Sequence, residues 1–152
     1  MNLKQQFDAL RGYVATHQIL KTILICEAWE IEGNLKPGIE YPLIVFTPTS
    51  STVYENAVHR SYRVIVMDQL NREKTNEEDV LNDCEKILSV FINEARIEGI
   101  HPLHYETMVL VGDPIIEPFK EEFGDWCAGY HGEIVLETSI GNNPCITLTR
   151  DV

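Results

Sequence analysis

Residues 76–98 constrain the fold of this chain more than any other segment, because they form a long, one-sided helical pattern. Apolar side chains recur there every three or four positions, as they do on a helix with one buried face. Gly99 follows the last of them and supplies a stop. We predict a helix over 76–98, about 33 Å long and able to cross a whole sheet. Its apolar stripe consists of Val80, Cys84, Ile87, Leu88, Phe91 and Ala95.

The start of this helix carries its own signals. Thr75 and Glu78 have the spacing of a capping box. Three consecutive acids also place negative charge at the positive end of the helix dipole. These acids are Glu77, Glu78 and Asp79.

The other periodic segments are mostly β-rich runs separated by turn residues. Hairpin-type links between them predict a largely antiparallel, twisted sheet with two helices on one face, in a single α+β domain covering 1–152. A Gly-Asp-Pro sequence at 112–114 predicts a bulge or bend within one strand. We predict a second helix over 2–17 and strands over 20–32, 41–48, 62–70, 106–119, 126–140 and 145–150.

Charge narrows the possible functions. The chain has 24 acidic and 12 basic residues and a net charge of −12. Tight nucleic-acid binding is therefore not expected, because phosphate contacts normally supply most of its affinity. There is no apolar run long enough to span a membrane and no secretory signal at the N-terminus. The four dispersed cysteines favour free thiols in a reducing cytosol.

The polar stretch between the predicted strands 41–48 and 62–70 is unusual for its length. Hairpin strands are commonly joined by two to five residues, whereas this connection covers 48–60. Long loops inside compact domains are more often functional than idle. We therefore predict that residues 48–60 form a loop and a contact surface.

Reactive side chains cluster in GDWCAGYHGEIVLE, where Asp125, Cys127 and His131 are close in sequence. In a strand, Cys127 and His131 lie about 13 Å apart, which is too far to share a metal or a proton. His101 and His104 could serve as zinc ligands only with two further residues, such as Cys127 or Cys145. No nucleotide-binding, hydrolase or metalloprotease motif occurs.

The remaining cysteines and aromatic residues are interpreted as core. Cys84 falls on the apolar helical stripe, and Cys26 alternates with Ile25 in a predicted strand. Trp126 and Tyr130 share one face of their strand. Glycines at 129 and 132 stand between and after them and suggest that a helix crosses closely there.

The order of these segments resembles a known family. An N-terminal helix and a long strand precede YPLIVFTP, a polar segment, YRVIVMDQL, the acidic helix NEEDVLNDCEKILSVFI and finally FGDWCAGYHGEIVLE. This order is similar to that of the tail-completion and tail-terminator-like neck proteins of tailed bacteriophages, including those of the crAss-like group. The resemblance covers roughly residues 3–149.

The resemblance implies a structural virion protein, made in the bacterial host cytoplasm, that forms a six- or twelvefold ring between portal and tail. It implies portal and other neck or tail proteins as partners, and DNA passing through the lumen without specific binding. It implies no enzyme activity, no cofactor and no bound metal.

Ring contacts of this kind join two different surfaces of one subunit. We expect Tyr54 to anchor one of them, because aromatic residues carry much of the energy of an interface. His59 and Arg60 are expected to pair with acids of a neighbour. The candidate acids are Glu77, Glu78 and Asp79, or Glu133 and Glu137, and the alternative for either set is that it lines the channel.

Two other interpretations are kept open. The first is a cytosolic adaptor of the same fold that binds one protein partner without forming a ring. The second is a small metal-dependent enzyme that uses the scattered histidines and cysteines.

Overall fold

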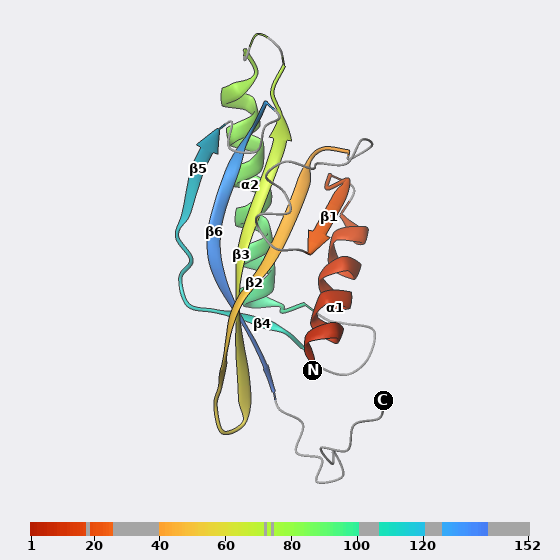
Figure 1. Ribbon diagram of the computed structural model, residues 1–152, viewed down its shortest axis with the longest axis vertical. Coiled ribbons are helices and arrows are strands. Elements are labelled where there is room, and N and C mark those ends of the chain that lie inside the picture. The colour runs from red at the N-terminus through yellow and green to blue at the C-terminus, as the bar shows by residue number, and fades with distance from the viewer. Residues whose placement is uncertain are drawn as a thin grey trace.

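The computed structural model describes residues 1–17, 19–25, 40–71, 73, 75–100, 107–120 and 126–139. Within these ranges the chain forms two helices and a six-stranded sheet (Figure 1). The helices are α1 (Leu3–Thr16) and α2 (Glu77–Ile97). The strands are β1 (Thr22–Ile25), β2 (Leu43–Val53), β3 (Ala57–Gln69), β4 (Val109–Val111), β5 (Ile116–Lys120) and β6 (Cys127–Ser139).

The sheet is mostly antiparallel. Its strand order is β1-β2-β3-β6-β4, and β5 pairs with β6 beside β4. Only β1 and β2 run parallel. The long strands β2, β3 and β6 form the centre, and β4 and β5 share one edge of β6. The predicted α+β architecture is confirmed.

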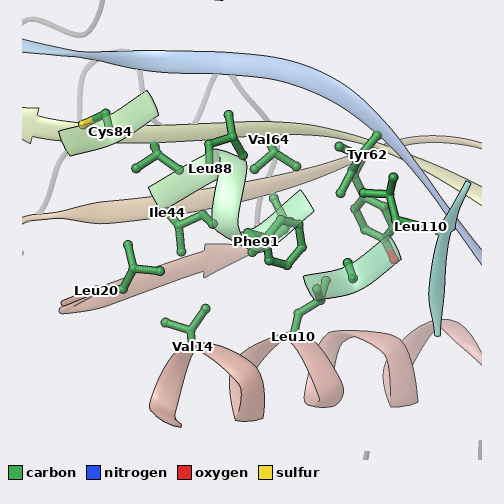
Figure 2. Close-up of a cluster of buried hydrophobic side chains, with 14 of the residues drawn as sticks. Leu10, Val14, Leu20, Ile44, Tyr62, Val64, Cys84, Leu88, Phe91 and Leu110 are labelled. Atoms are coloured by element: carbon green, nitrogen blue, oxygen red, sulfur yellow. The ribbon is translucent and has the colours of Figure 1, made fainter. Parts of the chain in front are cut away.

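Both helices pack on the same face of the sheet and enclose the main core (Figure 2). Five of the six residues in the predicted apolar stripe of α2 are buried, and Ile87 is partly buried. Leu10 and Val14 fix α1 against the same core, whereas Leu3 is exposed. Burial of a large aliphatic or aromatic side chain stabilises the fold by about 1.5–3 kcal/mol, so these contacts hold the two layers together.

The opposite face of the sheet carries a second, smaller cluster of buried residues. Its members come from β2, β3, β5 and β6, so these strands are buried on both faces at one end. Runs such as LIVF and VIVM suit this position, because strands covered on both sides are apolar without alternation. The cluster consists of Leu43, Val45, Ile65, Met67, Phe119 and Cys127.

The two helix starts differ from prediction. Asn2 caps α1 through a capping box with Gln5, which the sequence reading did not identify. At α2 the predicted Thr75–Glu78 capping box is wrong: the helix begins at Glu77, and Asn76 stands at the N-cap without a side-chain cap bond. The Thr75 hydroxyl instead accepts a hydrogen bond from the side-chain amide (Nδ2) of Asn71, 2.7 Å away. A turn closed by these polar side chains takes the place of the cap.

The predicted stop of α2 is confirmed. Gly99 has a φ of +74°, the left-handed conformation that glycine adopts without steric cost, and its amide donates to the Glu94 carbonyl.

The predicted loop over 48–60 is wrong. β2 continues to Val53 and β3 begins at Ala57, so most of this segment is a β-hairpin with a tight turn. The predicted strand 106–119 is likewise two strands, β4 and β5, separated at Gly112, whose φ is +82°. Residues 26–32 and the predicted strand 145–150 lie outside the described residues.

Candidate subunit interface

The long hairpin of β2 and β3 ends in what we call the hairpin arm, residues 48–61. Every residue from Pro48 to Asn56 is exposed. The arm extends beyond the ends of both helices, at the lower end of the molecule in Figure 1. Val53 is 71% and Tyr54 53% exposed, so the tip carries two large apolar side chains into solvent.

The tip of the hairpin arm is nevertheless ordered by its own contacts. The Tyr54 amide donates to the Ala57 carbonyl over 2.8 Å and closes the turn. The Tyr54 ring lies 4.5 Å from the ring of His59, centroid to centroid. The aromatic ring is therefore held in place on the outside of the turn, as a side chain at a recognition surface needs to be.

The flank of the arm is tied to β6. His59 Nε2 lies 2.6 Å from a carboxylate oxygen of Glu137, and Arg60 donates to the Thr138 hydroxyl over 3.2 Å. His59 was predicted to pair with an acid of a neighbour, but its close acid belongs to the same chain, because β3 and β6 bring residues 59 and 137 into register. Arg60 has no carboxylate partner among the described residues, so it retains donors for one.

The acids at the start of α2 are not equivalent. Glu77 is partly buried and lies 2.8 Å from the Lys120 ammonium on β5. Glu78 and Asp79 are exposed, and neither has an ion pair within the described parts of the chain. Of the three acids at the start of α2, Glu78 and Asp79 therefore remain available to a neighbour.

The structure does not bring the two sets of predicted interface residues together. From Arg60, β3 continues for about 30 Å to its end at Gln69 before the chain turns into α2. The hairpin arm and the start of α2 accordingly lie at opposite ends of the long axis in Figure 1. They can meet only between two molecules.

A surface groove between the end of α1 and the middle of α2 was not predicted. This α1–α2 groove encloses about 310 Å³. Its apolar wall consists of Tyr13, Ile19, Leu20, Ile87, Val90 and Phe91. These residues come from two segments far apart in sequence, 13–20 and 87–91, so no local pattern predicts the groove.

The aromatic wall of the α1–α2 groove is held by ring contacts and a hydrogen bond. Tyr13 packs edge-on against Phe91, with centroids 5.3 Å apart, and stacks on His17 at 4.1 Å. Its hydroxyl donates to the Glu94 carboxylate. Burial, together with this hydrogen bond and the charge of Glu94, raises the pKa of Tyr13 well above its ordinary value. The hydroxyl therefore remains a donor at physiological pH.

Acidic side chains border the same groove. Asp68, at the end of β3, and Asp83, on α2, both line it. Burial raises the pKa of Asp68, and the nearby charge of Asp83 adds to the shift, whereas a hydrogen bond from the Gln69 amide opposes it. The groove thus combines an apolar wall with hydrogen-bond acceptors, the composition typical of a recognition site.

A second cavity of about 470 Å³ lies on the sheet face opposite the helices. It is lined by charged side chains of both signs, contributed by β3, β6 and the segment around β5. Arg63 is the basic member, beside Asp113, Glu117, His131 and Glu133.

The cysteines and histidines that the structure describes form no joint site. Cys127 and His131 both lie in β6, four positions apart as predicted, and His131 contacts the Phe119 ring. Cys84 is buried, as predicted for a core residue, and burial is the main reason that its pKa rises to about 12. The positions of Cys26, His101, His104, Asp125 and Cys145 lie outside the described residues.

Within the described ranges, no group of three or more His, Cys, Asp or Glu side chains is arranged to hold a metal ion. No helix there is long and apolar enough to cross a membrane.

The prediction of Trp126 as core is wrong. It precedes β6 and is 51% exposed, whereas Tyr130 does pack against the main core. The two glycines accommodate neighbouring backbone, not a helix. A Cβ on Gly129 would lie 1.9 Å from the Val66 carbonyl oxygen, and one on Gly132 would lie 2.7 Å from that of Ile115.

Comparison of the chain with protein-family models and with curated proteins finds no match.

Proposed function

We propose that this protein is a structural ring subunit of a tailed-phage neck or tail end, which joins head or portal to tail around the DNA passage. The observation that carries the proposal is the hairpin arm, an ordered projection with an exposed aromatic tip.

The arm is built for contact with another molecule. Residues 48–56 are exposed and contribute nothing to either buried cluster. Tyr54 is held by the turn and by His59, so little side-chain freedom remains to be lost on binding. Tyrosine is also enriched at the centres of protein interfaces. An assembly that covers Val53 and Tyr54 would remove their apolar surface from water.

The two candidate surfaces are unlike and distant from each other, which is what a ring contact requires. The hairpin arm and the acids Glu78 and Asp79 lie at opposite ends of the subunit. A contact made once between two copies leaves one arm and one acidic helix start free, so it is head-to-tail, and head-to-tail contacts close into rings when the rotation per subunit allows. A contact made twice between the same two copies would give a two-fold dimer, which the mass of the assembly distinguishes from a ring.

Net charge suits a passage for DNA. Each copy brings a net charge of −12. A lumen with that sign of charge repels phosphates, so a duplex would pass without adhering.

The test is a native mass spectrum of the purified protein, alone and with a cognate portal. The expected result is a discrete, metal-free ring mass. Tyr54→Ala combined with Arg60→Ala is expected to abolish it. Ile115→Ala removes an apolar side chain that is more exposed than Tyr54 and lies outside the arm, and it should leave the ring intact.

The same spectrum distinguishes the other two interpretations. A bare monomer under both conditions would favour the adaptor. A monomer that binds stoichiometric zinc would favour the metal protein. Ring formation that survives the double substitution would exclude the arm from the contact.

A further inference from the structure

We infer that the α1–α2 groove receives the tip of the hairpin arm of a second copy of this chain, with Arg60 of that arm reaching the acidic start of α2. This inference rests on the proposed ring and identifies the two surfaces that join its subunits.

The α1–α2 groove and the tip match in size and chemistry. The groove, at about 310 Å³, has room for one tyrosine side chain. Its apolar wall, which includes the 42%-exposed Val90, offers contacts for an aromatic side chain. Asp68 and Asp83 offer carboxylate acceptors at its border for a phenol hydroxyl. A side chain with an apolar body and a polar end, such as Tyr54, is complementary to this composition.

The arm that fills the groove must belong to another molecule. Pro42 lies in the groove and immediately precedes β2, whereas Tyr54 immediately follows this strand. Along an extended strand, these two residues are separated by about 40 Å. A chain therefore cannot place its own tip in its own groove.

A continuous exposed face of α2 leads from the groove to the first turn of the helix. Asp79, Asp83, Lys86 and Val90 follow one another at intervals of four, three and four residues, and all are exposed. At these intervals side chains lie above one another on a helix. The face therefore forms a track about 16 Å long between Val90 and Asp79.

The arm brings Arg60 within reach of the acids at the start of α2. Ala57 lies across the turn from Tyr54, and Arg60 follows Ala57 by three positions, about 10 Å along the arm. With Tyr54 at Val90 and the arm along α2, the Arg60 backbone lies beside Asp83, because Val90 and Asp83 are also about 10 Å apart along the helix. The long arginine side chain extends from there toward the two acids in the first turn of the helix that have no ion pair among the described residues.

The dipole of α2 does not oppose this pairing. Its positive end is already compensated by three acids. Glu77 keeps its internal partner Lys120. An incoming arginine therefore meets two carboxylates without an ion pair among the described residues, and charge-assisted pairs of this kind specify register as well as affinity.

Charge reversal tests the pairing. Arg60→Glu and Asp79→Lys should each raise the concentration needed for ring assembly at least tenfold, measured by sedimentation velocity, and the double variant should restore assembly. Lys4→Glu makes the same change of charge as Arg60→Glu on the exposed side of α1 and serves as the control. Circular dichroism and urea unfolding should show that each variant is folded.

Mixing tests the two surfaces directly. Tyr54→Ala removes the tip and leaves the groove, whereas Val90→Asp disables the groove and leaves the tip. Each variant should be monomeric alone, and an equimolar mixture should give dimers and nothing larger, because only one productive contact can form.

The outcomes separate the inference from the function on which it rests. Rings that form equally well in wild type, Arg60→Glu, Asp79→Lys and Val90→Asp would overturn the inference and leave the ring standing. Folded charge variants that both fail, with no rescue by the double variant, would also overturn the pairing. A wild-type chain that stays monomeric even with portal would overturn the proposed function itself.

Discussion

The polar pair of Tyr62 and Gln6 shows how a single contact joins the two layers of the fold. Both side chains are buried, and the Tyr62 hydroxyl donates to the Gln6 side-chain carbonyl, linking β3 to α1. Gln6 Nε2 has no hydrogen-bond partner within the described residues. Because the pair is already incompletely satisfied, loss of its one hydrogen bond leaves two polar groups buried without a partner.

Tyr62→Phe is therefore expected to lower the free energy of unfolding by about 1–2 kcal/mol. Adding Gln6→Leu should recover most of this loss, because buried polar groups that are removed together leave nothing unsatisfied. Urea unfolding of the two single variants and the double variant measures both effects. Equal stability of Tyr62→Phe and wild type would contradict the role of the pair.

Tyr62→Phe should also change how the stability of the fold depends on pH. Burial raises the pKa of Tyr62 to about 12, whereas a tyrosine in the unfolded chain ionises near 10. The unfolded state therefore loses this proton first, and stability present below pH 10 is lost as the pH rises toward 12. In Tyr62→Phe the free energy of unfolding should fall less between pH 10 and pH 12 than it does in wild type. The fall that remains comes from Tyr13, whose pKa is also raised.

At the scale of elements, the sequence predicted the helix with a regular apolar period, and it did not predict strands that form by backbone pairing alone. The stripe of α2 was evident because its helical spacing is regular over six residues. The sequence predicts a loop at the hairpin arm, because TSSTVYENAVHR shows no alternation of apolar and polar residues. The structure forms strands there by backbone pairing: the exposed residues 48–53 pair with β3, and the partly buried residues 57–61 also pair with β6.

The sequence also predicted one part of the candidate site and not the other. Tyr54, Arg60 and the acids of α2 could be selected from the sequence, because interface chemistry favours those residue types. The α1–α2 groove could not be selected, because its wall exists only once α1 and α2 pack side by side. Asn2 and Gln5 form a capping box that their spacing in the sequence is compatible with, whereas Thr75 and Glu78 have the spacing but do not form one, because the turn before α2 uses Thr75.

The pairing of β3 with β6 at Gly129 gives a test at this scale. A Cβ there would lie 1.9 Å from the Val66 carbonyl oxygen, which belongs to backbone and cannot move aside without separating the strands. Gly129→Ala should therefore lower the free energy of unfolding by about 3 kcal/mol, the upper end for overpacking.

Gly12→Ala is the matched control. Gly12 lies in the exposed part of α1 and has nothing within 4 Å of an added Cβ. It should gain about 0.5–1 kcal/mol from helix propensity. Urea unfolding of both variants measures the difference, and a neutral Gly129→Ala would show that the central strands are less tightly paired than the structure indicates.

At the scale of the whole molecule, two properties bear on assembly: the two ends of the long axis differ, and the net charge is strongly negative. The hairpin arm projects from one end, and the unpaired acids of α2 mark the other (Figure 1). A subunit with unlike ends adds copies in one direction, and its assembly is limited by closure. The net charge of −12 then accumulates with each copy added.

This accumulated charge predicts how the protein behaves toward DNA. A basic DNA-binding protein releases counterions from phosphates, so its affinity rises steeply as salt is lowered. For a chain with a net charge of −12, lowering the salt removes the screening of a repulsion and should not create binding. Fluorescence anisotropy of a labelled duplex, titrated with assembled protein at low and physiological salt, is expected to show no saturable binding under either condition. A Kd below about 1 µM at physiological salt would instead reveal a local basic surface that overcomes the net charge, and a lumen that lets DNA slide freely would no longer be tenable.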